Sequence, residues 1–305
     1  MLNAKLFSSV NIHREAVDWH NRVLTNGGRV SKDTVKAVSD FCYRIDAAGI
    51  RAKFSRLNLI CGDNLNAARV PLYRGLSFTG TQYGNSIDTN NNFVSGDYTE
   101  RGSNGGLNAG SGGTKYLDTG VIPNNTNGFT GINNHMSMYV MNRLPSGAIY
   151  IGMDDSYGCC AGSCTYMYLV VEQNGSASAY IIGDNDNGGN YTGQFFSSSS
   201  VGLFLGCCDT GESGANSFTY TNGASDNDYT YGDMNSNSLN GAGLSITIFG
   251  YNHIALDEFF TCGLNDTYGT GHISSYSFGP FLTYDQQLSY YNALQAFQTA
   301  LGRNK

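Results

Sequence analysis

The chain has few charged residues and few prolines for its length. Of its 305 residues, 13% are charged, about half of the usual quarter in soluble domains, and only 4 are proline. Glycine (40) and tyrosine (21) are abundant instead, together with Asn and Ser. The sequence therefore predicts a polar, aromatic surface with little charge, and the chain is long enough to bury a sizeable core.

Basic residues are scarce after Arg101, and the formal net charge is −7. No continuous basic stripe exists to follow a phosphate backbone, so nucleic acid is not an expected partner. No apolar run approaches the roughly 18 residues that cross a bilayer, so no membrane insertion is predicted. Residues 1–31 lack the basic start, apolar centre and cleavage site of a signal peptide, so we expect synthesis in a cytosol.

Sequence patterns of catalytic and metal sites are also missing. The five histidines lie far apart, and there is no Gly-x-Ser-x-Gly elbow, HExxH motif or phosphate loop. The five glutamates lack the Glu-x-Asp-x-x-Glu spacing of jelly-roll glucanases, and adjacent Asp257 and Glu258 would point to opposite faces of a strand. No Cys-x-x-Cys pair suggests zinc. We expect no catalytic residue, metal or cofactor, and keep polysaccharide hydrolysis as an alternative.

Residues 1–73 predict a small helical element. One face of a short first helix is predicted to carry Val17, His20 or Asn21, and Leu24. Ser31 is a candidate N-cap for a second helix that ends near Gly49. These residues are too few to bury a core alone. We therefore expect the element to dock on the following domain or on another chain.

Residues 74–114 are dense in Gly, Asn, Ser and Thr and predict an ordered connector, pinned to a surface by recurring side chains such as Tyr83 and Phe93. Short strand candidates bounded by Gly, Asn or Asp then follow at 116–121, 136–142, 148–154, 166–172, 179–183, 201–207, 218–221, 244–251 and 272–278. Strands of this length and spacing predict a two-sheet antiparallel sandwich over residues 115–305.

A final amphipathic helix follows Pro280. Thr283 and Gln286 have the spacing of a capping box. The predicted apolar stripe consists of Leu288, Tyr291, Leu294, Phe297 and Leu301. That stripe needs a surface on which to be buried.

The last predicted strand, residues 272–278, is called the closing strand. Together with the final helix it resembles part of a known family. The strand is followed by FGPFLTYDQQLSYYNALQAFQTALGR, and the upstream blocks read RVPLYRG, NNNFVSGDYTE and TKYLDTGV. These motifs resemble concanavalin A-like (laminin-G-like) jelly-roll domains in virion structural proteins of tailed bacteriophages and prophages. The resemblance covers most of the chain.

The resemblance implies a mainly β, concanavalin A-like antiparallel sandwich with a small N-terminal helical element and a C-terminal helix. It implies a non-enzymatic head-decoration, collar, tail or fibre component whose partners are other virion proteins and copies of itself. Such a protein is assembled in the host cytoplasm and becomes extracellular with the virion. Fold alone does not fix the ligand.

Asp- and Asn-rich turns suggest a bacterial surface glycan as a further partner. Residues 152–158, 183–193 and 224–235 are expected at the ends of the sandwich, where loops carry recognition, and they combine aromatic rings with short polar side chains. The candidate glycan-binding residues are Asp154, Asp155, Tyr157, Asp184, Asn185, Asp186, Tyr191, Asp226, Asp228 and Tyr229.

Three other interpretations of these turns and of the composition stay open. The turn residues suit backbone geometry without any ligand. Calcium would suit their oxygen atoms, although no EF-hand spacing occurs. A purely architectural cement protein with no host ligand fits equally well, because protein interfaces are also rich in tyrosine and poor in charge.

Six of the eight cysteines cluster in the β-rich part. Cytosolic thiols usually stay reduced, but a virion is oxidised after lysis. We therefore expect at least one disulfide between the group Cys159, Cys160 and Cys164 and the pair Cys207 and Cys208, or a disulfide between subunits. The alternative is that these cysteines are buried thiols that pack as small hydrophobic side chains.

Overall fold

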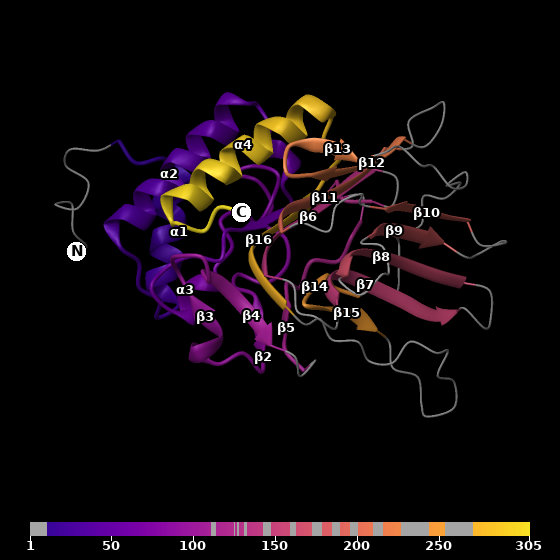
Figure 1. The fold of residues 1–305 in the computed structure, drawn as a ribbon, viewed down its shortest axis with the longest axis horizontal. Coiled ribbons are helices and arrows are strands. Elements are labelled where there is room, and N and C mark those ends of the chain that lie inside the picture. Colours follow the sequence, from indigo (N-terminus) through magenta and orange to yellow (C-terminus); the bar gives the residue numbers. More distant parts are fainter. Residues whose placement is uncertain are drawn as a thin grey trace.

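The computed structural model describes residues 11–110, 114–124, 126, 128–130, 133–142, 148–158, 163–172, 179–184, 190–195, 201–209, 216–226, 244–253 and 271–305. Within these residues the protein is mainly β, with two antiparallel sheets, a group of N-terminal helices and one C-terminal helix (Figure 1).

Two antiparallel helices open the described chain, α1 (Arg14–Thr25) and α2 (Lys32–Ala47). Ser31 is the N-cap of α2, as predicted, because its hydroxyl accepts a hydrogen bond from the Thr34 amide at 3.2 Å. The predicted face of α1 is wrong, since Leu24 is 37% exposed. The buried face is set by Trp19, whose indole is fully packed and donates to the Val70 carbonyl at 3.0 Å.

The sheets begin earlier in the chain than the predicted boundary at residue 115. The early elements are η2 (Arg51–Lys53), β1 (Arg56–Asn58), α3 (Leu65–Ala68), β2 (Thr89–Asn91), η3 (Ser95–Asp97), β3 (Tyr98–Thr99) and β4 (Gly106–Gly110). Strand β1 therefore lies inside the predicted helical element, and β2 to β4 lie inside the predicted connector. All four belong to the two sheets.

The later strands are β5 (Tyr116–Asp118), β6 (Asn133–Asn142), β7 (Ala148–Gly158), β8 (Ser163–Glu172), β9 (Ala179–Asp184), β10 (Asn190–Phe195), β11 (Gly202–Asp209), β12 (Asn216–Thr221), β13 (Ala224–Asp226), β14 (Thr247–Ile248), β15 (Gly250–His253) and β16 (Gly271–Gly279). Sheet A has the order β13-β12-β11-β6-β16-β4-β3, with β1 also on β16. Sheet B has the order β10-β9-β8-β7-β14-β5-β2, with β15 beside β7. Among the described pairings, only that of β15 with β7 is parallel.

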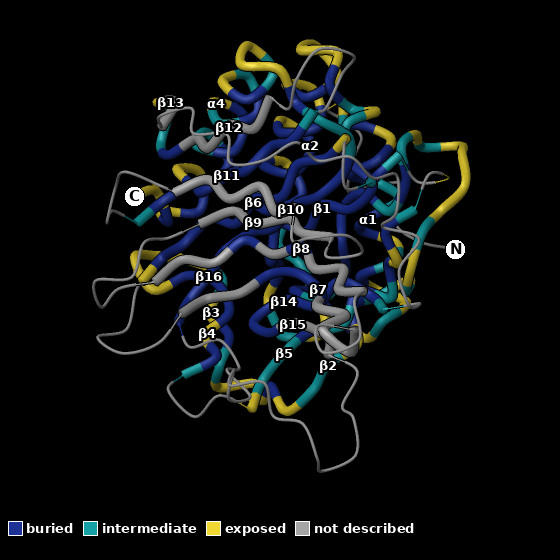
Figure 2. The backbone as a smooth tube through the Cα atoms, turned by 90° about the vertical axis from the view of Figure 1, so that its right-hand side faces the viewer, coloured by how far each residue is buried: buried dark blue, intermediate teal, exposed yellow. Residues whose placement is uncertain are grey.

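Sheet A is covered on both faces. Alternate residues of β6 point to opposite sides, so Tyr139 and Met141 join a core with the helices, whereas Met138 and Val140 join a core with sheet B. Most of β6 and all of β16 are buried (Figure 2). The described residues thus form three layers, in the order helices, sheet A and sheet B.

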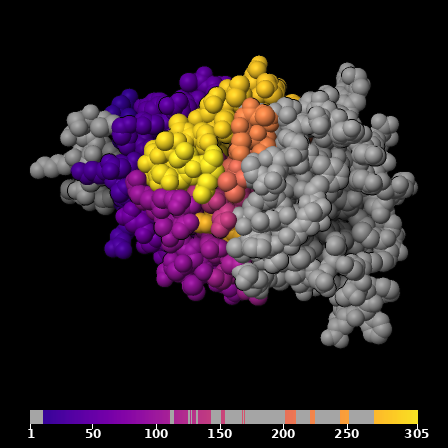
Figure 3. All heavy atoms as spheres, in the orientation of Figure 1, coloured from indigo at the N-terminus to yellow at the C-terminus, as the bar shows by residue number. Residues whose placement is uncertain are grey.

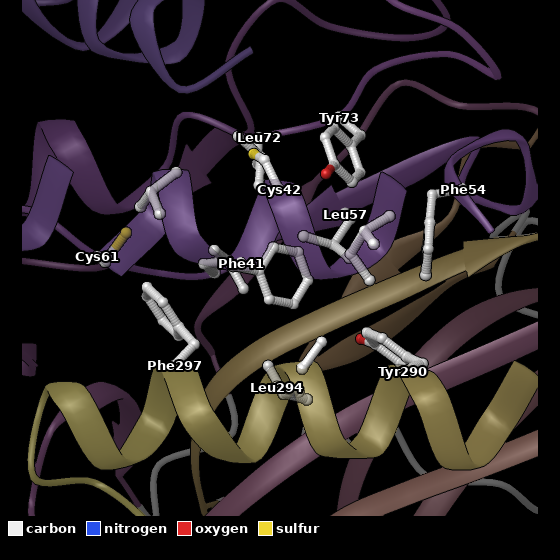
Figure 4. Close-up of a cluster of buried hydrophobic side chains, with 14 of the residues drawn as sticks. Phe41, Cys42, Phe54, Leu57, Cys61, Leu72, Tyr73, Tyr290, Leu294 and Phe297 are labelled. Carbon is white, nitrogen blue, oxygen red and sulfur yellow. The ribbon is translucent and has the colours of Figure 1, made fainter. Parts of the chain in front are cut away.

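Helix α4 (Tyr284–Ala300) completes the helical layer, and its capping box is confirmed by the Thr283 amide, which donates to the Gln286 side chain at 3.0 Å. The predicted stripe is partly wrong, because Leu288 is 36% exposed and Tyr291 is only half-buried. The face that is buried instead consists of Tyr290, Ala293, Leu294, Phe297 and Leu301. These side chains meet α2 and the segment around β1 (Figure 4).

Tyr290 explains why the buried face of α4 differs from the predicted stripe. Its ring packs 5.0 Å from the ring of Phe54, and its hydroxyl lies 3.2 Å from the Ser137 hydroxyl on β6. A tyrosine in this position fills a large buried volume and still has a hydrogen-bond partner.

Cys207 and Cys208 are free, buried thiols, so the structure does not show the predicted disulfide to either of them. They are neighbours on β11 and therefore point to opposite faces. Cys207 packs in the helical core with Gln287 Nε2 at 3.5 Å, and Cys208 packs between the sheets, where burial raises the pKa of its thiol to about 12. Cys164 lies on β8, whereas Cys159 and Cys160 lie outside the described residues, so a bridge between subunits through that group stays a prediction.

Candidate functional site

The predicted glycan-binding residues fall on two sheets. Residues 152–158 lie within β7 and not in a turn, because this part of the strand continues its pairing with β8. The pairing places Asp155 beside Thr165, which in turn lies beside Asp184 on β9. Asp154 and Tyr191 occupy the next row of the same sheet through the partners Tyr166 and Gly183.

The remaining candidates do not join this group in the described chain. Asp226 is on β13 of sheet A, where it pairs with Thr219. Asn185, Asp186, Asp228 and Tyr229 lie outside the described residues. Tyr157 lies in β7, near an irregularity in the register between Asp155 and Gly158. The backbone thus brings together two pairs on strands β7 to β10, Asp155 with Asp184 on one face of sheet B and Asp154 with Tyr191 on the other.

A second candidate site is a charged pocket beside α1, which sequence analysis did not predict. It has a volume of about 170 Å³. It is lined by Glu15, Asp18 and Arg22 of α1, by Arg51 of η2, and by Leu72, Arg74, Phe78, Thr79, Gly80 and Gln82. We call it the arginine pocket.

Arg22 fixes one wall of the arginine pocket. Its Nε donates to Asp18 at 2.7 Å, while its two terminal nitrogens donate to the carbonyls of Pro71 and Leu72 at 2.6 and 3.0 Å. Burial lowers the pKa of Arg22, and the adjacent Asp18 opposes that change. All three nitrogens are therefore engaged within the protein.

Arg51 is also hydrogen-bonded to groups within the protein. Its Nε donates to both carboxylate oxygens of Glu15, at 2.8 and 2.9 Å, and one terminal nitrogen donates to the Gly75 carbonyl at 2.8 Å. Its guanidinium also lies 3.8 Å from the centre of the Tyr73 ring, a cation–π contact. Glu15 and Arg51 therefore neutralise each other.

Arg74 differs from these two arginines. Its Nε is shielded from solvent and has no hydrogen-bond partner in the described part of the chain. Burial lowers the pKa of Arg74, Asp18 raises it, and nearby Arg56 lowers it. The arginine pocket therefore contains a partly desolvated positive charge that Asp18 stabilises through its charge, while the Asp18 carboxylate is hydrogen-bonded to Arg22.

A buried polar cluster holds the segment that forms the outer wall of the pocket. Asp88 is fully buried and accepts from Arg56, from the Tyr276 hydroxyl at 2.6 Å and from Asn58 at 2.8 Å. Burial alone would lower the pKa of Arg56, but the adjacent Asp88 and Tyr276 raise it. Arg56 also donates to the carbonyls of Tyr83 and Asn85, which ties the chain after Gln82 to β1 and β16.

Two of the five histidines, His135 on β6 and His272 on β16, are buried in sheet A and have a strongly lowered pKa. His135 lies 2.8 Å from the Pro280 carbonyl and 3.1 Å from the Ser277 hydroxyl, and burial lowers its pKa to about 4. Burial also lowers the pKa of His272 to about 4. In the described residues, no group of three or more His, Cys, Asp or Glu is arranged to hold a metal ion.

Sequence reasoning missed the arginine pocket because Arg22, Arg51 and Arg74 are far apart in the chain. The available local signal was that Arg74 lies within RVPLYRG, but nothing in that block specifies which helix covers it.

No protein-family model matches this chain, and no curated protein matches it. Among the described helices, none combines the length and apolar character needed to span a bilayer.

Proposed function

We propose that this chain is a non-enzymatic structural protein of a tailed-phage or prophage virion, built on a concanavalin A-like jelly roll. It serves as a head-decoration, collar, tail or fibre component. The helical layer docks on the particle, and the sandwich is directed outward. The virion assignment depends on the resemblance of the closing strand and helix.

The junction between β16 and α4 is the observation that supports this proposal most. Strand β16 has β6 on one side and β1 and β4 on the other, so the segment with the strongest resemblance lies inside sheet A. Helix α4 follows directly and packs on α2. Neighbours that are distant in sequence, such as β6 and β16, favour a jelly roll over a simple meander.

The arrangement of the candidate glycan residues supports an attachment role. Asp154 and Tyr191 share one row of sheet B, which is the layer farthest from α1 and α2 (Figure 1). Ile151 and Met153 of β7 belong to the core between the sheets, so the alternation along the strand assigns Asp154 to the outer face and Asp155 to the inner one. A lectin-like surface around the Asp154 row would stay accessible while the helical layer contacts other virion proteins or further copies of the chain.

Virion membership is tested on particles purified from the bacterium that produces the chain. We expect the protein in washed particles, at a fixed ratio to the major capsid protein, and as a regular density in an electron-microscopy reconstruction. Absence from washed particles, with the protein recovered only from the cell lysate, would contradict the proposal.

The attachment role is tested with the recombinant chain on host cells and glycan arrays. Replacing Asp154 by Asn together with Tyr191 by Ala, in the row on the outer face of sheet B, should abolish binding, whereas Asp40→Asn, on the exposed side of α2, should leave it intact. Binding only to purified capsid, collar or tail would favour the architectural alternative. Release of reducing sugar from surface polysaccharide would favour the hydrolase alternative.

A further inference from the structure

The arginine pocket has an uneven balance of charge. It contains three guanidinium groups and two carboxylates, and each carboxylate is held by its own arginine, Glu15 by Arg51 and Asp18 by Arg22. Arg74 is the third guanidinium, and its Nε has no hydrogen-bond partner in the described chain. The pocket as described is therefore complementary to one negative charge.

The charge balance also limits the type of anion. A guanidinium presents two parallel N–H groups that match the two oxygens of a carboxylate. A dianion such as phosphate would bring a second negative charge close to Glu15 and Asp18, and this repulsion is strong where solvent is partly excluded. A monocarboxylate matches the single unpaired guanidinium.

The apolar part of the lining suggests what the carboxylate is attached to. Leu72 and Phe78 contribute hydrophobic surface beside the polar groups. The Phe78 ring is held in place by Arg14, whose guanidinium lies 5.0 Å from the ring centre. A volume of about 170 Å³ suits a short aliphatic stem and not a large ligand.

We propose that the arginine pocket binds a monocarboxylate on a short apolar stem, with Arg74 as its ionic partner and Phe78 and Leu72 against the stem. Two sources share this chemistry. One is a free small acid, and the other is an acidic side chain of a partner protein. The site is independent of the virion assignment.

The test is isothermal titration calorimetry of the full chain with propionate at constant ionic strength, with chloride in the reference titration. Arg74→Gln should weaken propionate binding at least about tenfold, the effect of losing a charge-assisted hydrogen bond. Arg74→Lys, which keeps the charge but loses the planar fork, should give an intermediate affinity. The matched control is Arg44→Gln, on an exposed part of α2, which should bind as the unchanged chain does.

Thermal unfolding of each variant establishes that it is folded before its affinity is compared. Equal weakening by Arg44→Gln and Arg74→Gln would show general electrostatics and overturn the proposal. Binding of inorganic phosphate as tight as that of propionate, or no saturable binding of any carboxylate, would also overturn it.

A second titration distinguishes the two sources. N-acetylglutamate α-amide represents a glutamate side chain within a peptide, because its γ-carboxylate is the only carboxylate that remains free. Tighter binding of this compound than of propionate supports a partner protein as the source, whereas tighter binding of propionate supports a free acid. Failure of both to bind would overturn the proposal.

Discussion

At the scale of single residues, two fully buried arginines join segments that are distant in the chain. Arg56 is paired with the carboxylate of Asp88. Arg303 donates instead to the Gln298 side chain and to the carbonyls of Ile60 and Leu59, at 2.8, 2.9 and 3.1 Å. Burial lowers the pKa of Arg303. In both cases the guanidinium satisfies backbone oxygens of irregular segments, which would otherwise be buried without partners.

The Asp88 cluster leads to a prediction about stability. Asp88→Asn keeps the shape of the side chain but leaves Arg56 buried without a counter-charge, so we expect a loss of about 3–5 kcal/mol in the free energy of unfolding. The control Asp40→Asn breaks an exposed pair with Lys36 and should cost no more than about 1 kcal/mol. Urea unfolding measures both, and equal effects of the two substitutions would contradict the structural role of Asp88.

His135 leads to a prediction about pH. Burial lowers its pKa from 6.5 to about 4, so the folded state favours the neutral ring. The corresponding stability is fully present above pH 6.5 and is lost as the pH falls from 6.5 towards 4. Urea unfolding between these values should show the decline, and His135→Gln should make it shallower. A ring that titrates near 6.5 by NMR would contradict this account.

At the scale of elements, α4 is a helix whose orientation is set by the surface it covers. Its mixed sequence offers two adjacent stripes of large side chains, and the tertiary contacts of Tyr290 and Phe297 decide between them. Phe297 packs 6.1 Å from Phe41 on α2, and the two rings meet edge to face. Leu294 is consequently fully buried, while Leu288 is 36% exposed.

The same substitution at these two leucines tests the orientation of α4. Leu294→Ala should lower the free energy of unfolding by about 2–5 kcal/mol, because it leaves a cavity between α4 and α2. Leu288→Ala should change it by less than about 1 kcal/mol. Both are measured by urea unfolding, and a larger effect at Leu288 would mean that the stripe predicted from the sequence is the buried one.

The sequence predicted the long elements better than the short ones. Most strands after residue 115 have the predicted positions, because each carries its own apolar pattern between Gly, Asn or Asp residues. Strand β1 was not predicted, since its three residues Arg56, Leu57 and Asn58 have no strand pattern and pair only because β16 lies beside them. The arginine pocket was also beyond prediction, because tertiary packing alone brings Arg22, Arg51 and Arg74 together.

At the scale of the whole molecule, the helical layer and the sandwich are one structure. The core that joins α1, α2 and α4 includes Leu57 of β1 and Leu203 and Leu205 of β11. In Figure 3 the C-terminal helix lies against the N-terminal helices on the surface of the molecule. A cut at the predicted boundary of residue 115 would separate β1 and β4 from β16 and expose the outer face of sheet A.

This continuity predicts that residues 115–305 do not fold alone. The fragment should aggregate, because the apolar surfaces of α4 and sheet A that α1, α2 and β1 cover, including Leu294 and Phe297, would be exposed. The control fragment 11–305 keeps every helix and strand of the described chain and should unfold in urea as the full chain does. A soluble 115–305 fragment with a cooperative unfolding transition would contradict this prediction.

The helical layer contains segments from both halves of the described chain, and this has a consequence for biosynthesis. Helices α1 and α2 are translated before β16 and α4 and cannot complete their packing until those later elements have been made. Contacts of such long sequence separation form slowly. While the residues between α2 and β16 are being translated, the apolar faces of α1 and α2 are therefore uncovered, and we expect a dependence on cellular chaperones during that interval.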